Sequence, residues 1–427
     1  MTSPEKAYSI QSHEENDVKA GEARCPVDHS ALSHQKTSHG AVVRASEKPF
    51  ERDEQGVWHI YGFDEARTVL RSSVTKQAGF NAEMIESVPG TTNRPILYLE
   101  GKEHNQQRKQ TARFFTPKTV SSDYRAFMEK LSDQLIRKLK RKKRADLSDL
   151  SLKLAVQVAA QVVGTTNSIF PGMGLRLNSF FEGGEVSEET NPVRKLFSRI
   201  YHSLQQSNVM LFFMLDVKPS IRVRRRKAQE DVISHLLSLN YNEAEILTEC
   251  VTYAAAGMVT TREFISVAAW HFLEHPELRA RYLTAPEEER IEMLHETLRL
   301  EPIVRNLQRR ATDDIEIENQ GKHATIQKGD LINIDIHAAN MDETVVGEEP
   351  YALCPMRPLH GDRVPSMVMS FGDGPHRCPG AYIAIQETDI FLQRLLALDT
   401  LHIERTPTIK WNDLTTGYEI RDFQKNG

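Results

Sequence analysis

The stretch "SFGDGPHRCPGA", from Ser370 to Ala381, is the feature that most constrains this chain. It places three glycines, two prolines, a histidine, an arginine and a single cysteine within twelve residues. Glycine lets a backbone approach another group closely and proline fixes φ, so this composition predicts a rigid loop around one side chain. The apolar pattern "AYIAIQETDIFLQRLLAL" has helical spacing and follows at once. The fold must therefore hold Cys378 just before the start of a long helix.

Three kinds of site compete for Cys378. A dinucleotide-binding loop would need a further glycine at the position of Arg377, and the chain lacks it. A zinc site could draw on four possible ligands, whose spacing resembles no compact zinc knuckle: Cys354, His360, His376 and Cys378. A haem-thiolate site needs one cysteine as axial ligand, with backbone N–H groups and a helix N-terminus near the sulfur. Pro379 suits the first position of such a helix. The residues favour haem, with zinc as the weaker alternative.

A haem group also carries two propionates, which need cations. His376 lies two residues before Cys378 and can face the same side of the ring. His104 and Arg108, in "GKEHNQQRKQTARFFTP", are four residues apart and share one helical face. Arg309 stands at the start of an alternating, strand-like segment. Each of these residues alone is typical of a protein surface, but together they predict a set of propionate ligands.

Most of the remaining chain has helical patterns. The stretch "SLKLAVQVAAQVVG" ends at Gly164, a residue suited to a left-handed cap. The segment 243–278 predicts one very long helix, apolar on most sides, that crosses the interior. Strand-like alternation appears at 57–61 and between 309 and 336, and "SMVMSF" is a further extended candidate. The predicted fold class is mainly α, an α+β arrangement of a large helical region and a small β region.

Composition and charge argue against several classes of protein. A net charge of −5 and a pI of about 6.4 give no sign of nucleic-acid binding. The longest strongly apolar run, 209–215, has seven residues and is too short to span a bilayer. The first 24 residues have no apolar core, so no secretory signal is predicted. The four cysteines lie far apart, which argues against a disulfide framework and for a reducing, cytoplasmic location.

With these motifs in place, the sequence resembles the cytochrome P450 family from about residue 42 to the C-terminus. "FGDGPHRCPG" matches the family's haem loop, Phe-x-x-Gly-x-x-x-Cys-x-Gly. "ETLR" matches its Glu-x-x-Arg motif at Glu296 and Arg299, and "PMRP" supplies Arg357 to complete that charge cluster. "HNQQR" and "RRATDDIEI" match segments that reach the propionates, and "AGMVTT" matches the central helix motif in part. The motifs occur in the family's order.

The resemblance implies a cytochrome P450 fold in which a single catalytic domain, residues 42–427, surrounds haem b. Residues 1–41 are expected to be a polar, mobile arm. Cys378 would bind the haem iron. The implied propionate ligands are His104, Arg108, Arg309 and His376. The implied structural residues, which support the haem loop, are Glu296, Arg299 and Arg357.

The implied activity is that of an oxidoreductase, a monooxygenase that activates dioxygen and oxidises a small, apolar organic substrate. Electrons would come singly from a separate ferredoxin-type carrier and its reductase. An alternative within the same fold is a haem-thiolate enzyme with atypical chemistry, such as peroxide use, nitration or oxidative coupling. A third, less favoured interpretation is a non-enzymatic haem-binding sensor.

The central helix motif departs from the family at one position. An acid usually precedes the threonine of this motif, but here Val259 precedes Thr260. Valine has neither a donor nor an acceptor and cannot relay protons. Thr260 keeps its expected catalytic role, while the proton source stays open between a water chain, a polar group of the substrate and Glu263.

Substrate-pocket candidates come from the segment 77–100 and from the central helix motif. The segments 171–186 and 209–215 are expected to roof the pocket as a lid. Every pocket candidate is equally compatible with core packing. The candidates are Phe80, Met84, Ile85, Leu97, Met258 and Val259.

Overall fold

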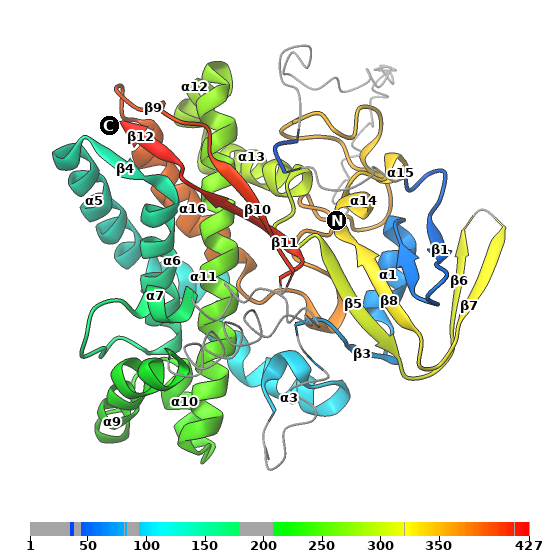
Figure 1. Cartoon of the computed structure of the whole chain (residues 1–427), viewed down its shortest axis with the longest axis horizontal. Coiled ribbons are helices and arrows are strands. Elements are labelled where there is room, and N and C mark those ends of the chain that lie inside the picture. Colours follow the sequence, from blue (N-terminus) through cyan, green and yellow to red (C-terminus); the bar gives the residue numbers. More distant parts are fainter. Residues whose placement is uncertain are drawn as a thin grey trace, which may run out of the picture.

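The computed structural model describes residues 35–37, 44–80, 82, 94–178, 208–319, 321–413 and 415–426, and the structural statements below concern these residues. Most helices lie on one side of the molecule, together with the strands of residues 402–426, and the strands of residues 50–77 and 306–335 lie on the other side with shorter helices (Figure 1). The α-helices are α1 Phe63–Arg71, α3 Gly101–Thr111, α4 Pro117–Thr119, α5 Arg125–Lys142, α6 Leu147–Val163, α7 Met173–Asn178, α9 Lys218–Arg226, α10 Val232–Ser238, α11 Glu243–Glu274, α12 Pro276–Thr284, α13 Glu287–Leu300, α14 Ile336–Asn340, α15 Glu343–Val346 and α16 Ala381–Leu396.

The strands are short. They are β1 Phe50–Arg52, β2 Trp58–Ile60, β3 Thr75–Gln77, β4 Arg144–Asp146, β5 Asn306–Ala311, β6 Ile315–Asn319, β7 Lys322–Ile326, β8 Leu331–Asp335, β9 His402–Ile403, β10 Thr408–Asn412, β11 Gly417–Arg421 and β12 Gln424–Asn426. The predicted mainly α fold with a small β region is confirmed.

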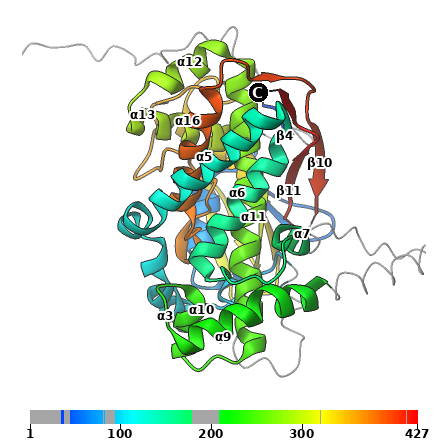
Figure 2. The ribbon, with the colours of Figure 1, turned by 90° about the vertical axis from the view of Figure 1, so that its left-hand side faces the viewer.

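Helix α11 is the predicted long central helix. Asn242 and Glu245 form a capping box at its N-terminus, and the helix ends at Glu274 because Pro276 opens α12. Helix α6 runs beside it (Figure 2) and α16 also packs against it, while α5 packs against α6 and α16. The predicted cap of α6 is confirmed, since Gly164 has φ +99° and any Cβ there would meet the Asp231 carboxylate at 2.6 Å.

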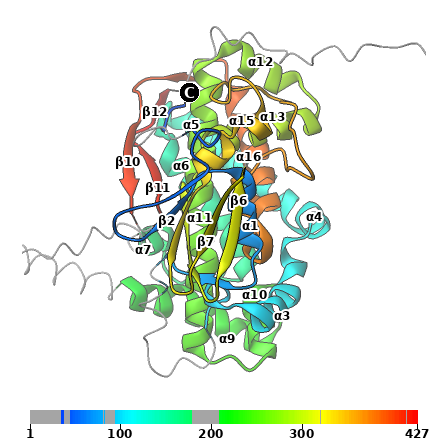
Figure 3. The same cartoon turned by 90° about the vertical axis from the view of Figure 1, so that its right-hand side faces the viewer.

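The β region combines strands from residues 50–77 with strands from residues 306–335. One sheet has the strand order β1-β2-β8-β5-β3, with β2 parallel to β8 and the other pairs antiparallel. Strands β6 and β7 form a hairpin beside helix α1 (Figure 3). The strands predicted around 57–61 and 309–336 are therefore confirmed.

One predicted strand is wrong. Residues 366–371, "SMVMSF", form successive turns rather than a strand. Their backbone N–H groups find acceptors within the segment or on Asn340: Val368 N bonds Pro365 O at 2.8 Å, and Met369 N bonds Asn340 Oδ1 at 2.8 Å. A segment whose donors are already paired in this way has none left for a neighbouring strand.

The cysteines also require a correction. Cys354 is disulfide-bonded, whereas Cys250 and Cys378 are free thiols. The wide spacing of the cysteines argued against a disulfide framework and gave no signal of this one bond, because separation along the sequence does not report separation in space. Cysteine spacing thus no longer argues for a reducing compartment.

Residues 35–37 pack against the helical region. Glu301, whose side chain is fully buried after α13, accepts hydrogen bonds from the backbone N–H of Lys36 at 2.5 Å and of Thr37 at 3.2 Å. The Thr37 hydroxyl and His271 of α11 face the same carboxylate. These contacts join residues 35–37 to Glu301, which follows α13.

A buried ion cluster joins α13 to the chain that follows α14. Arg299 is fully buried and donates to both carboxylate oxygens of Glu296, at 2.7 and 2.8 Å. Arg357 donates to the same carboxylate at 3.2 Å. Arg299 also donates to the carbonyl oxygens of Asn340 and Pro350. The cluster thus fixes the segment 340–357, and the Asn340 side chain in turn bonds Ser370, where the cysteine loop begins.

We predict that Arg299→Met lowers the free energy of unfolding by roughly 3–5 kcal/mol, because it leaves the buried Glu296 carboxylate without its main partner. Urea unfolding of the purified protein measures this change. The matched control is Arg363→Met, because the Arg363 side chain is 90% exposed and its loss should change stability by less than about 0.5 kcal/mol. Equal stabilities of the two variants would contradict the role given to the cluster.

Candidate active site

Cys378 lies between a 3₁₀ turn, Gly374–His376, and the N-terminus of α16. Its backbone N–H donates to the carbonyl of Phe371 at 2.9 Å, which closes the loop onto itself. Cys378 as a residue is exposed to solvent, but many protein atoms lie around its sulfur atom. Burial raises the pKa of the Cys378 thiol, and hydrogen bonds from the N–H groups of Gly380 and Ala381 oppose that shift. The sulfur is thus partly desolvated, with donors already aimed at it.

The glycines of the loop have a steric cause. Gly374 has φ +65°, and a Cβ at this position would lie 2.2 Å from the carbonyl oxygen of Leu70. Only glycine allows the loop to lie this close to the end of α1. Asp373 completes the contact, because it pairs with Arg71 of α1 at 3.0 Å and Arg67 at 3.5 Å. The loop is therefore held between α1 and α16.

The four predicted propionate ligands come together at one place. The rings of His104 and His376 stack with their centroids 4.0 Å apart. His376 Nε2 lies 2.8 Å from one oxygen of Glu100, and Arg309 Nη1 lies 3.3 Å from the other. Arg108 Nη2 donates to the Arg377 carbonyl at 2.6 Å, beside Cys378. Helix α3, strand β5 and the cysteine loop each contribute to this cluster.

The electrostatics of the cluster suit an anion. Burial lowers the pKa of His104 to about 4, with His376 and Arg108 adding to the shift. His104 is therefore neutral near pH 7 and can donate one N–H. Burial lowers the pKa of Arg309 as well, and Glu100 opposes that shift. An arginine remains charged after such a shift, so Arg309 still attracts carboxylates.

The middle of α11 borders the same region. Burial lowers the pKa of Arg108, whereas Tyr253 of α11 and Cys378 oppose that shift. Arg108 therefore lies close to both of these residues. Two turns further along α11, Thr260 is half-buried, and its hydroxyl donates to the Ala256 carbonyl at 2.6 Å. Ala256 is exposed within this helix, and Val259 is 4% exposed.

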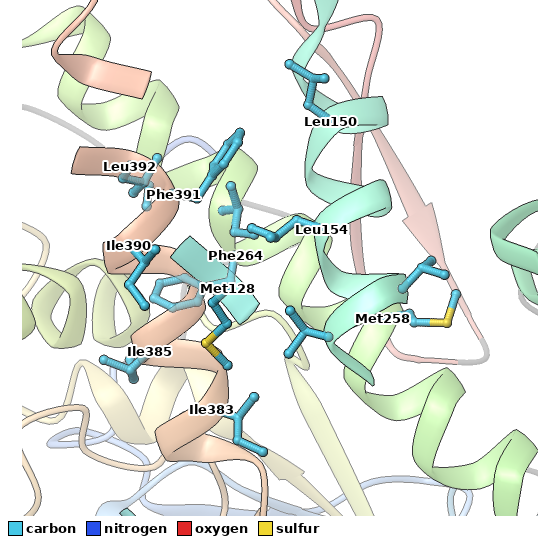
Figure 4. Packing of buried hydrophobic residues seen from close by; sticks show 14 of the residues in the cluster. Met128, Leu150, Leu154, Met258, Phe264, Ile383, Ile385, Ile390, Phe391 and Leu392 are labelled. Atoms are coloured by element: carbon cyan, nitrogen blue, oxygen red, sulfur yellow. The ribbon is translucent and has the colours of Figure 1, made fainter. Parts of the chain in front are cut away.

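The other predicted pocket residues differ in their placement. Met258 lies in the main hydrophobic core, where Figure 4 shows it beside α6, so it is a packing residue here. Phe80 and Leu97 lie on a segment tied together by the bond from the Tyr98 hydroxyl to the Phe80 carbonyl at 2.7 Å. Met84 and Ile85 lie outside the described residues, as do residues 179–186 of the predicted lid at 171–186.

Sequence reasoning missed Glu100, Glu249 and Glu387. Glu100 directly precedes α3 and holds Arg309 and His376, and its spacing in the sequence gives no signal of this. Glu249 of α11 accepts from the Ile96 N–H at 3.2 Å and from Gln107 at 2.6 Å. Burial raises the pKa of Glu249 to about 7. An acid within an apolar helical pattern was the available signal for both Glu249 and Glu387.

Three observations indicate that these residues are suited to hold haem b. The predicted propionate ligands Arg309 and His376 hold a carboxylate, that of Glu100, which is the group a propionate would present. His104 Nδ1 is buried and has no hydrogen-bond partner among the described residues. Cys378 presents a thiol with backbone donors behind it. The zinc alternative, in contrast, loses Cys354 to a disulfide.

Comparison with known proteins agrees with this geometry. The family model described as Cytochrome P450 matches residues 292–412. The biotin biosynthesis cytochrome P450 of Bacillus subtilis is 25% identical over 373 residues, 84% of this chain and 86% of that protein. Erythromycin C-12 hydroxylase of Saccharopolyspora erythraea is 25% identical over 370 residues, 82% of this chain and 84% of that protein. The chain belongs to the cytochrome P450 family.

Solved structures share the fold of this P450. The crystal structure of CalO2 superposes with a TM-score of 0.73 at 20% identity, covering 89% of this chain and 93% of that one. P450BioI in complex with an acyl carrier protein carrying hexadec-9Z-enoic acid gives 0.69 at 22% identity, covering 90% and 96%. The protein is thus a haem-thiolate oxidoreductase of the monooxygenase class, and its cofactor is haem b.

We predict that Cys378→Ala abolishes the red-shifted absorption band that reduced P450 enzymes give with carbon monoxide, because it removes the thiol to which the loop's backbone N–H groups donate. Cys250→Ala should keep the band, since Cys250 is a free thiol buried in the core. A difference spectrum of each reduced variant measures the effect. A band that persists in Cys378→Ala would show that the iron ligand lies elsewhere.

We predict that Arg108→Ala speeds haem release roughly 10- to 100-fold, because a charge-assisted hydrogen bond worth about 1.5–3 kcal/mol is lost. Haem transfer to an excess of a haem-scavenging protein gives the rate. Lys109→Ala is the matched control, as Lys109 is the next residue of α3 and is exposed. Wild-type release rates in both variants would reject Arg108 as a propionate ligand.

Proposed function

We propose that this P450 receives electrons one at a time from a ferredoxin-type carrier, which a separate reductase reduces, and hydroxylates a small, apolar organic substrate in the cytoplasm. The balance is one substrate, one dioxygen, two electrons and two protons in, and one hydroxylated product and one water out. The observation that carries the proposal is that Arg108 lies near both Cys378, with its backbone donors, and Tyr253 of α11, two turns before the Thr260 hydroxyl.

Each of these residues has a separate role in the proposed reaction. Haem b, held by Cys378 and by the cluster of His104, Arg108, Arg309 and His376, supplies dioxygen activation. The N–H groups after Cys378 stabilise its thiolate. Thr260 offers a hydroxyl that can exchange its bond to the Ala256 carbonyl for one to a reacting oxygen.

An acidic, ferredoxin-type carrier is supported by the charges near Cys378. Exposed side chains of Lys109 and Arg113, which follow the propionate ligand Arg108, and of Arg377 lie at this end of the molecule. Like-signed exposed charges attract a partner of opposite charge and speed its encounter. The described residues include no helix that is both long and apolar enough to cross a bilayer.

An apolar substrate is supported by the side chains at the site. Val259 replaces the usual acid, and Leu97 and Phe80 lie on the neighbouring segment. Among similar proteins, one is named erythromycin C-12 hydroxylase, and P450BioI was solved in complex with an acyl carrier protein carrying hexadec-9Z-enoic acid. We further propose that residues 42–427 form one catalytic domain, since a single hydrophobic core cluster includes residues from Phe114 to Phe423.

A second candidate function is atypical haem-thiolate chemistry, such as peroxide use, nitration or oxidative coupling. Val259 is the observation that favours it, because an enzyme fed by peroxide takes its oxygen already protonated. Such an enzyme needs no acid beside Thr260.

A ligand screen followed by turnover tests the proposal. Substrates identified by a shift of the haem Soret band should be hydroxylated when NADPH, a ferredoxin and its reductase are supplied. One atom of ¹⁸O₂ should appear in the product by mass spectrometry. Product formed with hydrogen peroxide, and none with the carriers, would favour the second candidate instead.

A further inference from the structure

Glu249 of α11 is a buried acid to which the proposed function gives no role. The residue is 1% exposed. Its Oε1 accepts a hydrogen bond from Gln107 Nε2 of α3 at 2.6 Å and another from the Ile96 backbone N–H at 3.2 Å. Its Oε2 is buried and has no hydrogen-bond partner among the described residues. One oxygen atom therefore joins the central helix to α3 and to the segment that precedes α3.

Helix α3 depends on such contacts for its position. The elements that α3 packs against most are its own neighbours in the chain, the 3₁₀ turns Ile96–Tyr98 and Ala112–Phe115. Figure 1 shows α3 beside the N-terminal part of α11. Two contacts link α11 to this region: the hydrogen bond from Gln107 to Glu249, and the stack of Tyr253 on Phe115 with ring centroids 5.8 Å apart. Of these two, the hydrogen bond is made by α3 itself.

Helix α3 also carries two of the predicted propionate ligands. His104 lies three residues before Gln107, and Arg108 follows Gln107 directly. Arg108 reaches the Arg377 carbonyl beside Cys378 at 2.6 Å, and the His104 ring stacks on His376. Residues of one short helix move together, because its backbone hydrogen bonds fix their relative positions. The bond between Gln107 and Glu249 therefore helps to place both ligands.

No positive charge compensates the Glu249 carboxyl. The hydrogen bonds from Gln107 and Ile96 lower its pKa, and no cation of the described residues adds to their effect. Three neighbouring side chains have pKa values raised by burial first and by the charge of Glu249 second, so they stay neutral near pH 7: Tyr241, Cys250 and Tyr253.

The other ionisable groups of the surrounding elements have contacts of their own or face solvent. On α11, Glu243 pairs with Arg225 at 2.9 Å, and Glu245 accepts from the backbone N–H of Asn242 at 2.9 Å. On α3 and the segment before it, the groups with contacts of their own are Tyr98, Glu100, His104 and Arg108. The groups that are exposed to solvent are Arg94, Lys102, Glu103 and Lys109.

A buried carboxyl without a cation favours its protonated form. Burial raises the pKa of Glu249 to about 7, and the hydrogen bonds from Gln107 and Ile96 oppose that shift. If the interface opens and water reaches the carboxyl, its pKa returns toward the ordinary 4.5. Opening thus releases a proton, so it becomes easier as the pH rises from about 4.5 to about 7. Above about pH 7 the carboxyl is ionised in both states, and pH has no further effect through this group.

We propose that Glu249 is a positioning residue that clamps α3 and residues 96–99 onto the central helix, and that this clamp governs how firmly the chain holds haem b. The protonated carboxyl keeps the clamp closed. The carboxylate loosens it, because a buried charge without a cation gains free energy from water. His104 and Arg108 follow α3, so loosening weakens two propionate contacts. The inference goes beyond the proposed function and rests only on haem b as the cofactor.

Haem release at several pH values tests the clamp. Glu249→Gln keeps an oxygen for both hydrogen bonds but cannot ionise. The release rate of the wild-type protein, divided by that of Glu249→Gln, should rise on the order of tenfold between about pH 5.5 and about pH 8. Transfer of haem to an excess of a haem-scavenging protein gives both rates, and the ratio cancels titrations that the two proteins share. A constant ratio would overturn the inference.

Glu103→Gln is the matched control, because it removes an exposed acid from α3 itself. The release rate of the wild-type protein divided by that of Glu103→Gln should stay within about twofold at every pH, as for a surface substitution. A rise as large as that for Glu249→Gln would assign the pH dependence to the general charge of α3 and would overturn the role of Glu249.

Two further variants separate the hydrogen bonds from the charge. Glu249→Leu leaves the donors of Gln107 and Ile96 without this acceptor, so haem release should be fast at both pH values, whereas Glu249→Gln should keep the slow release of the wild-type protein at about pH 5.5. Gln107→Leu removes the bond from the α3 side and should also speed release at about pH 5.5. If Glu249→Gln does not fold, Gln107→Leu decides, since wild-type release in that variant would overturn the clamp.

Hydrogen exchange of the haem-loaded protein gives a second readout. Peptides that cover residues 96–111, corrected for the effect of pH on the exchange chemistry itself, should exchange faster at about pH 8 than at about pH 5.5 in the wild-type protein. In Glu249→Gln the corrected rates should be equal at both pH values, and peptides from α5 serve as the internal control. Corrected wild-type rates that do not change with pH would show that this interface does not open on ionisation.

The failure of this inference and the failure of the proposed function give different results. Neither readout uses turnover, so both can be scored whatever substrate the enzyme oxidises. A constant release ratio in a protein that still gives the carbon monoxide band rejects the clamp alone. A rising ratio in a protein that hydroxylates nothing with the carriers rejects the proposed function alone and leaves the clamp in place.

Discussion

The contact between the Cys378 sulfur and the first N–H groups of α16 is the interaction on which the rest of the site depends. Burial alone favours the neutral thiol and raises its pKa, whereas the N–H groups of Gly380 and Ala381 favour the thiolate. The hydrogen bonds reduce the effect of burial on the pKa but do not cancel it. A cation bound to the sulfur would settle the balance in favour of the thiolate, because a coordinating thiol loses its proton outright. The loop is therefore built for a metal-bound sulfur rather than for a free cysteine.

Holding that sulfur in place requires support from distant parts of the chain. Gly374 lets the loop touch the end of α1, and Asp373 fastens it there through Arg71. On the other side, Arg299 fixes the carbonyl of Asn340, whose side chain bonds Ser370. The ion cluster on α13 thus acts on the cysteine loop through one intervening residue. Loss of Arg299 should consequently disturb the loop although no part of Arg299 reaches Cys378.

The parts of this structure that were predictable from the sequence depend on local pattern. The helix 243–274 follows from its capping box and apolar periodicity, and the cap of α6 follows from Gly164. The cysteine loop was predictable because its glycines and prolines lie within twelve residues. "SMVMSF" was misjudged because its donors are paired by the side chain of Asn340, distant in sequence.

What could not be predicted are contacts whose two partners are far apart. Glu100 meets Arg309 and His376, which lie more than 200 residues further along the chain. Thr37 meets Glu301, and Cys354 has a disulfide. The acid at position 387 looked like one polar residue in an apolar helix, and only the packing of α16 on α11 places it next to Thr261.

Position 259 shows how the packing of α11 bears on the proposed chemistry. Val259 is 4% exposed, and an unpaired ionisable group buried there would cost free energy. Valine avoids that cost, but it has neither a donor nor an acceptor and relays no protons. Glu263, one turn further along α11, is already engaged by the Ile420 N–H, Arg421 and Arg262. Proton delivery in the proposed enzyme therefore depends on the Thr260 hydroxyl together with water or a polar group of the substrate.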